Sequence, residues 1–64
     1  MKTRVFVIQD RDTEYFYNNG SWEYSLDFAQ QMSITNACDL IDKLEEQGKD
    51  NLRIEHIESL RPSY

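Results

Sequence analysis

The chain is 64 residues long, with 12 acidic and 7 basic side chains and a formal net charge of -5. This length predicts one domain over residues 1–64, which buries only about 60% of the surface that the unfolded chain exposes, so the stability margin is thin. The negative charge repels a phosphate backbone at long range and argues against direct nucleic-acid binding. No apolar run is long enough for a membrane segment or a targeting signal, and the single cysteine, Cys38, fits a reducing compartment. We therefore expect a cytoplasmic protein.

The first part of the chain predicts a β-hairpin. Arg4 to Gln9 contains the unbroken apolar run Val5-Phe6-Val7-Ile8, which is typical of a strand covered on both faces or placed centrally in a sheet. After a polar turn, Glu14 to Tyr17 is rich in aromatic strand formers, and Asn18-Asn19-Gly20 ends that strand. The two strands are expected to pair antiparallel.

The segment after the hairpin predicts a short helical turn. Trp22 and Tyr24 are expected in extended or loop geometry. Ser25 is a suitable N-cap for a turn over Leu26 to Gln31, because its hydroxyl can accept a hydrogen bond from an amide of the first turn. This piece is expected to close one end of the core.

One amphipathic helix is predicted over Thr35 to Gly48. Thr35 is expected to cap its first turn, and Gly48 to end it in the left-handed conformation. A helix of this length is marginal alone in water, so its apolar face needs a partner surface. Spacings of three, four and seven place its apolar residues on one face, which consists of Ala37, Leu40, Ile41 and Leu44.

A closing strand is predicted over Leu52 to His56, where apolar and polar residues alternate. Ile57 and Leu60 fall out of that phase, so the strand either bulges or gives way to a helical turn, and 61–64 is expected to form a loose tail. The resulting fold class is α+β, a small two-layer sandwich with topology β-β-(short helical turn)-α-β. A right-handed crossover predicts a three-stranded antiparallel sheet of order 2-1-3, with one main helix on one face.

The pattern of core residues resembles a loose class of very small phage and prophage proteins. It consists of the apolar first strand, the aromatic pair Tyr15 and Tyr17, then Trp22, a Leu-x-x-Ala segment, a Ser/Thr-capped helix with alanine in its first turn, and the closing strand. The resemblance implies a compact two-layer α/β fold and a phage or mobile-element setting. Many proteins of that class are anti-defence factors, including anti-CRISPR inhibitors. It assigns no functional residue, because the matching positions are structural.

An acidic row on the main helix is the first candidate site. Asp39, Asp42 and Glu46 are separated by three and four residues, or roughly 4.5 to 6 Å of helical rise, and Glu45 and Asp50 extend the cluster. A rigid acidic row of this spacing can occupy a cationic nucleic-acid channel. The alternative is an ordinary solvated helix face, since two lysines, Lys43 and Lys49, interrupt the row.

A group of aromatic residues is the second candidate site, namely Tyr15, Tyr17, Trp22 and Tyr24. One helix covers only one face of a sheet, so the other face is expected to be open and to carry Tyr15 and Tyr17. Acidic neighbours argue against base stacking and favour a basic protein surface or a second copy of the chain. Trp22 and Phe16 are more typical of core residues.

An enzyme is the least favoured reading of the sequence. Cys38 and His56 are the only residues that suggest a nucleophilic pair, but no third orienting group accompanies them. No ligand spacing indicates a metal, and no cofactor is expected. We predict a non-enzymatic protein-binding module of the bacterial host cytoplasm that blocks a host protein, possessing no direct nucleic-acid or membrane contact, or alternatively a homodimeric structural module. The predicted partner-binding residues are Tyr15, Tyr17, Asp39, Asp42, Glu45 and Glu46.

Overall fold

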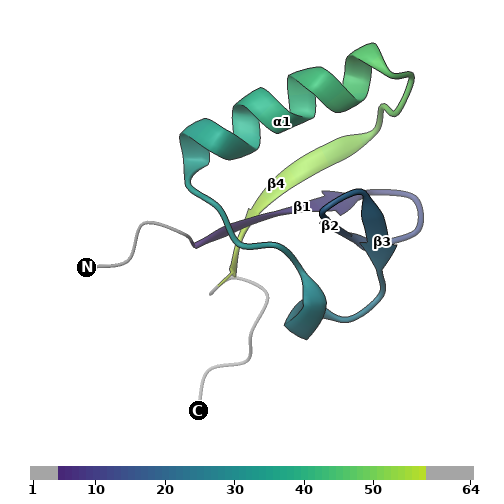
Figure 1. The fold of residues 1–64 in the computed structure, drawn as a ribbon. Coiled ribbons are helices and arrows are strands. Elements are labelled where there is room, and N and C mark those ends of the chain that lie inside the picture. The colour runs from purple at the N-terminus through teal and green to yellow at the C-terminus, as the bar shows by residue number, and fades with distance from the viewer. Residues whose placement is uncertain (1–4, 58–64) are drawn as a thin grey trace.

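The computed structural model describes residues 5–57, and these residues form an α+β fold (Figure 1). The predicted class is therefore confirmed, while the expectations for Arg4, Leu60 and 61–64 concern positions outside the described residues. The elements are β1 (Phe6–Asp10), β2 (Phe16–Asn18), β3 (Ser21–Glu23), the 3-10 helix η1 (Leu26–Phe28), α1 (Ile34–Glu46) and β4 (Leu52–His56).

The strands form one antiparallel sheet in the order β3-β2-β1-β4. The predicted sheet of three strands in the order 2-1-3 is wrong, because β3 adds a fourth strand beside β2. The apolar strand β1 lies between β2 and β4, and its Ile8 is paired with Ile54 of β4. The closing strand has the predicted bounds, and Ile57 is buried directly beyond it.

The additional strand arises from a two-residue turn at Asn19 and Gly20. Their φ angles are 47° and 91°, and the flanking residues Asn18 and Ser21 are paired across the hairpin. Two successive positive φ values are characteristic of a type I′ turn, whose twist matches that of the strands it joins. Asn-Gly between strand-forming residues is a strong hairpin signal, so the turn starts a new strand as well as ending β2.

Both ends of α1 are closed by specific hydrogen bonds. At the N-terminus the hydroxyl of Ser33 accepts from the amide of Asn36 at 3.2 Å, so the predicted cap Thr35 is wrong and lies within the helix. At the C-terminus Gly48 has a φ of 94°, as expected. Its amide donates to Glu45, and the amide of Lys49 donates to the carbonyl of Leu44 at 2.9 Å. This Schellman arrangement fixes where Lys49 leaves the helix.

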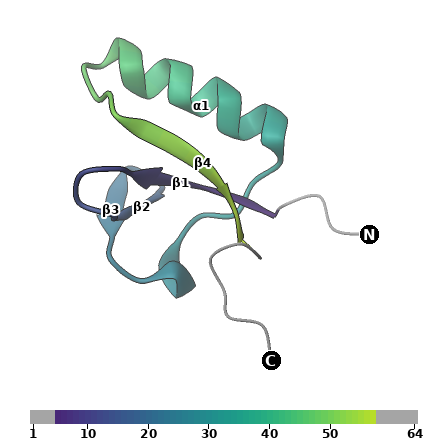
Figure 2. The ribbon, with the colours of Figure 1, turned by 180° about the vertical axis from the view of Figure 1, so that it is seen from behind.

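Helix α1 covers one face of the sheet, over β1 and β4 (Figures 1 and 2). The core between α1 and the sheet contains the buried residues Ile8 of β1, Met32 and Ala37 of α1. Partly buried apolar side chains of α1 and β4 surround them. Because side chains alternate along a strand, Ile8 faces α1 and Val7 faces the opposite side of the sheet. The sequence left the choice between these two faces open.

The face opposite α1 is covered by the chain itself. Val7, Phe16 and Ala29 form a second buried cluster, and Leu26 of η1 packs against it. η1 is shorter than the predicted turn over 26–31, but its predicted cap is confirmed, since the hydroxyl of Ser25 accepts from the amide of Asp27. The expectation of an uncovered sheet face that carries Tyr17 is therefore wrong, because the segment carrying η1 fills the space over Val7 and Phe16, and Tyr17 packs against the cluster of Ile8 on the α1 side.

Candidate protein-binding surface

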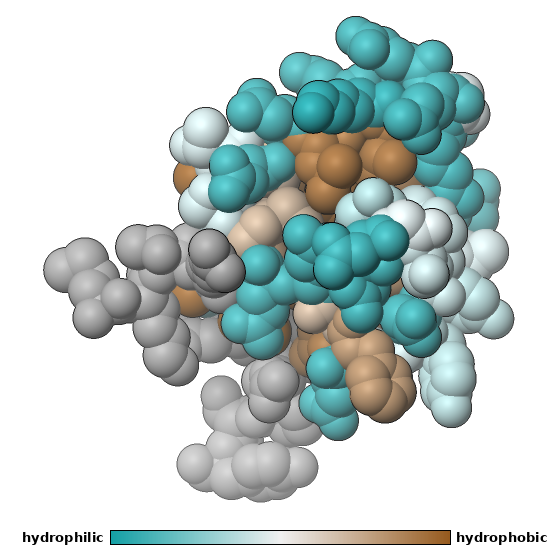
Figure 3. All heavy atoms as spheres, viewed as in Figure 1, coloured by the Kyte–Doolittle hydropathy of each residue, from teal (hydrophilic) through white to brown (hydrophobic). Residues whose placement is uncertain are grey.

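The acidic row lies on the outer face of α1. Asp39, Asp42 and Glu46 are exposed, and at 100° per residue they lie opposite the buried residues Ala37 and Leu44. Figure 3 shows a hydrophilic covering over the helix, with a hydrophobic band beneath it toward the sheet. The structure thus places these three predicted carboxylates together on one exposed surface.

The exposed Lys43 lies at the edge of this outer face, one turn from Asp39, but no carboxylate of the face forms an ion pair within the described part of the chain. The two ion pairs there join Lys49 to Asp10 and Arg53 to Glu55, so neither uses a carboxylate of α1. Glu45 is also exposed, but the helical period turns it toward one flank of the row. We define the acidic face as Asp39, Asp42 and Glu46, with Glu45 at its margin.

A hollow of about 400 Å³ borders the acidic face. Asp39 and Lys43 line it from α1, and Gln30, Gln31 and Met32 line it from the segment that precedes the helix. Side-chain amides can both donate and accept hydrogen bonds, so this concave area offers polar partners beside a row of negative charge.

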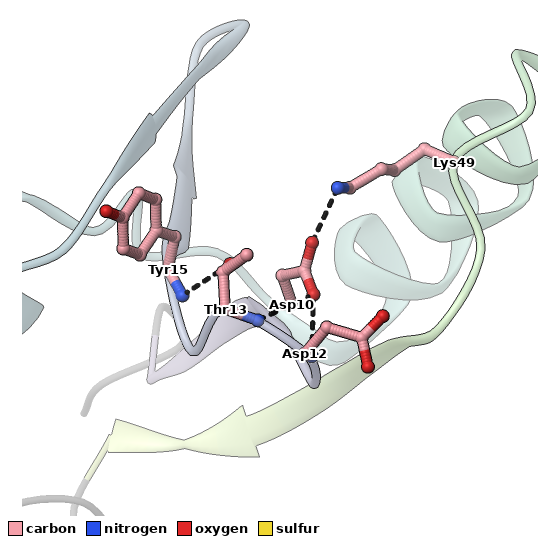
Figure 4. A network of polar contacts seen from close by, with 5 residues as sticks. All are labelled: Asp10, Asp12, Thr13, Tyr15 and Lys49. Carbon is pink, nitrogen blue, oxygen red and sulfur yellow. Dashed lines mark hydrogen bonds and ion pairs between the residues drawn. The ribbon is translucent and has the colours of Figure 1, made fainter.

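Lys49 is partly exposed, and its ammonium group contacts residues of the sheet instead of the acidic row. Its ammonium nitrogen lies 2.5 Å from a carboxylate oxygen of Asp10 and 4.9 Å from the centre of the Trp22 ring. The other oxygen of Asp10 accepts from the amides of Asp12 and Thr13 (Figure 4). The hydrogen bond from Lys49, followed by these backbone amides, lowers the pKa of Asp10, although burial opposes the change. Lys49 therefore does not interrupt the acidic face as its place in the sequence suggests.

The two predicted tyrosine anchors have different surroundings. Tyr17 is half-buried, and its ring meets Trp22 edge to face with centroids 5.4 Å apart. Tyr15 is 44% exposed, its amide donates to the hydroxyl of Thr13, and its ring points away from Lys49 (Figure 4). Of the pair, only Tyr15 is available for a large contact. The sequence did not distinguish it from two still more exposed aromatic residues, Tyr24 at 80% and Phe28 at 59%.

The residues considered for other chemistry lie in unrelated places. Cys38 is exposed on α1, while the ring of His56 packs against Phe6 at a centroid distance of 5.1 Å. Among residues 5–57, no three histidine, cysteine or carboxylate side chains are placed so that they could hold a metal ion together. No helix among them is long and apolar enough to cross a bilayer.

The fold and its surface define a small α+β protein with one acidic helix face. Comparison with protein-family models, curated proteins and solved structures produced no match. The function is therefore argued from the geometry of the chain.

Proposed function

We propose that this protein is a non-enzymatic binding module that inhibits a host protein by covering a basic, nucleic-acid-handling surface. The acidic face of α1 makes the main contact. In this proposal the module acts in the cytoplasm of a bacterial host, in the phage setting that the sequence resemblance implies. Its target loses access to nucleic acid while the module is bound.

The observation that carries the proposal is the exposed row of Asp39, Asp42 and Glu46, which forms no ion pair among residues 5–57, on a helix closed at both ends. A rigid helix holds its carboxylates at fixed spacing, so little conformational entropy is lost when lysine or arginine side chains bind them. Like charges on the module and on phosphate groups repel each other, and both attract the same basic surface. Competition with nucleic acid follows from that shared preference.

Tyr15 is the proposed aromatic anchor of a second contact, which comes from the turn before β2 and not from α1. An exposed tyrosine supplies a large, rigid contact at low entropic cost, and interfaces are enriched in such residues. Tyr17 supports the hairpin of β2 and β3 through its contact with Trp22. The binding role first assigned to both tyrosines is thus proposed for Tyr15 alone, with Tyr17 as its structural support.

Charge reversal with a matched control tests the proposal. The test variant carries Asp39→Lys, Asp42→Lys and Glu46→Lys, and the control variant carries Asp12→Lys, Glu14→Lys and Glu23→Lys. Both change the net charge equally, but the control alters the hairpins instead of α1. Each immobilised protein is used to capture partners from nuclease-treated bacterial lysate, and circular dichroism monitors the fold.

We expect the unchanged protein and the control variant to retain one basic partner that high salt releases, and the test variant to lose it while remaining folded. Lysine near the C-terminus of a helix is favourable, so the reversal at Glu46 does not disfavour α1. Equal capture by the test variant would show that the acidic face is only a solvated surface.

A further inference from the structure

Strand β4 is an edge of the sheet, and its outward backbone groups can be identified. The amide of Ile57 donates to Val5, and the amide of Arg11 donates to Asn51, so the odd-numbered residues of this segment direct their backbone groups toward β1. Backbone groups alternate in direction along an antiparallel strand. The amides and carbonyls of Leu52 and Ile54 therefore point away from the sheet, and they have no hydrogen-bond partner among residues 5–57.

The charges of β4 make this edge complementary to itself. If two copies pair antiparallel with Ile54 opposite Ile54, then Arg53 of each copy lies opposite Glu55 of the other. The outward groups of Ile54 then form a hydrogen-bonded pair, and the two charge pairs occupy the closer, non-hydrogen-bonded positions. The two nearest registers with the same hydrogen-bonding pattern are centred on Arg53 and on Glu55. They would instead place Arg53 opposite Arg53 or Glu55 opposite Glu55. Of these three registers, only the one centred on Ile54 avoids like-charge contacts.

Both charged side chains have room for such a contact. The side chain of Arg53 is 43% exposed and that of Glu55 is 25% exposed, and they lie 2.8 Å apart within one chain. Arg53 also donates to the side-chain oxygen of Gln9 at 3.0 Å. Both side chains lie on the face of β4 opposite α1, and the bond to Gln9 directs Arg53 toward β1, so in a dimer Arg53 would exchange this bond for Glu55 of the second copy.

The flank of α1 above this edge carries exposed apolar surface. Phe6 pairs with His56 on one side and with Met32 on the other, so Met32 lies on the β2 side of β1. The hollow that contains Met32 also borders Leu40, so the opposite flank of α1, with Ile34 and Ile41, lies toward β4. Ile34 is 47% exposed and Ile41 is only partly buried.

We propose that β4 pairs antiparallel with β4 of a second copy of this chain, in the register centred on Ile54. The sheet becomes continuous across the two copies, and both α1 helices lie on the same face with their isoleucine flanks toward each other. The acidic face points away from the sheet and stays exposed, so the dimer presents it twice. This inference does not depend on the proposed inhibitory function.

Sedimentation velocity over micromolar to millimolar concentration tests the dimer with four proteins. The unchanged chain is expected to dimerise. Glu55→Arg places positive charges opposite each other twice and should weaken the dimer by at least about tenfold. The double variant Arg53→Glu with Glu55→Arg restores opposite charges and should recover the original affinity. Glu23→Arg, on the other edge strand β3, is the matched control and should leave dimerisation unchanged.

Amide hydrogen exchange of Leu52 and Ile54 gives a second measurement that needs no variant. In the proposed dimer, the protection of both amides increases with protein concentration, whereas the amide of Arg53 is already bonded to β1 and changes less. A chain that stays monomeric at millimolar concentration would overturn the proposal. So would a dimer in which Glu55→Arg has no effect or the Ile54 amide exchanges independently of concentration.

Discussion

Lys49 binds Asp10 across the fold, joining the turn that follows α1 to the last residue of β1. The Schellman hydrogen bonds at the end of α1 place Lys49, and the turn after β1 holds Asp10 through two backbone amides. Trp22 of β3 lies against the same ammonium group. One cation therefore links the helix, the central strand and the outer hairpin. In so small a domain, this link stabilises the position of the acidic face of α1 relative to Tyr15.

The strength of this link can be measured by a double-mutant cycle. Asp10→Asn keeps an acceptor for the turn amides but removes the charge, and Lys49→Met keeps most of the side-chain volume. Because the side chain of Lys49 is 41% exposed, we expect each single variant to lower the free energy of unfolding by only about 1 kcal/mol. The coupling should be about 0.5–1 kcal/mol in urea denaturation followed by Trp22 fluorescence. Additive effects would mean that the two residues act independently.

The ionisation of Asp10 predicts an acid-dependent loss of stability. Its pKa is lowered in the folded chain from an ordinary value of 3.8, chiefly by the hydrogen bond from Lys49. The folded state thus favours the ionised form, and its contribution is fully present above 3.8 and lost as the pH falls through the lower, folded pKa. The difference in unfolding free energy between the unchanged chain and Asp10→Asn should therefore shrink on acidification. A difference that stays constant in acid would contradict this assignment.

The two tyrosines are predicted to respond differently to truncation. Tyr17→Ala removes a half-buried ring from its contact with Trp22 and should lower the free energy of unfolding by about 1–3 kcal/mol. Tyr15→Ala should change it by no more than about 0.5 kcal/mol, because that ring is largely exposed. Thermal and urea denaturation of both variants provide the comparison. A large destabilisation by Tyr15→Ala would assign that ring to the core and remove it as an anchor.

The sequence predicted those elements whose signals are local and strongly periodic. The closing strand, the apolar face of α1 and the role of Gly48 follow from side-chain alternation, helical spacing and tolerance of positive φ. The N-cap was assigned to Thr35 instead of Ser33, because two hydroxyl residues stand close to the helix start and both can cap. β3 was missed although Asn19-Gly20 is a hairpin signal, since three-residue strands carry little pattern of their own.

The candidate surface was predictable only in part. Helical spacing alone placed Asp39, Asp42 and Glu46 together, and the structure shows them exposed. The contact of Lys49 with Asp10 joins residues far apart in the chain, so no local pattern indicates it. The half-buried position of Tyr17 depends on the partner supplied by β3, and the coverage of Val7 depends on how the segment with η1 folds back over the sheet.

Competition with nucleic acid tests the central claim most directly. The basic partner retained by the unchanged protein is purified and bound to a fluorescently labelled nucleic acid, and increasing amounts of this protein are added while anisotropy is recorded. We expect the labelled nucleic acid to be displaced, with the variant reversed at Asp39, Asp42 and Glu46 unable to displace it. A ternary complex, in which the partner holds both the nucleic acid and this protein, would contradict the account.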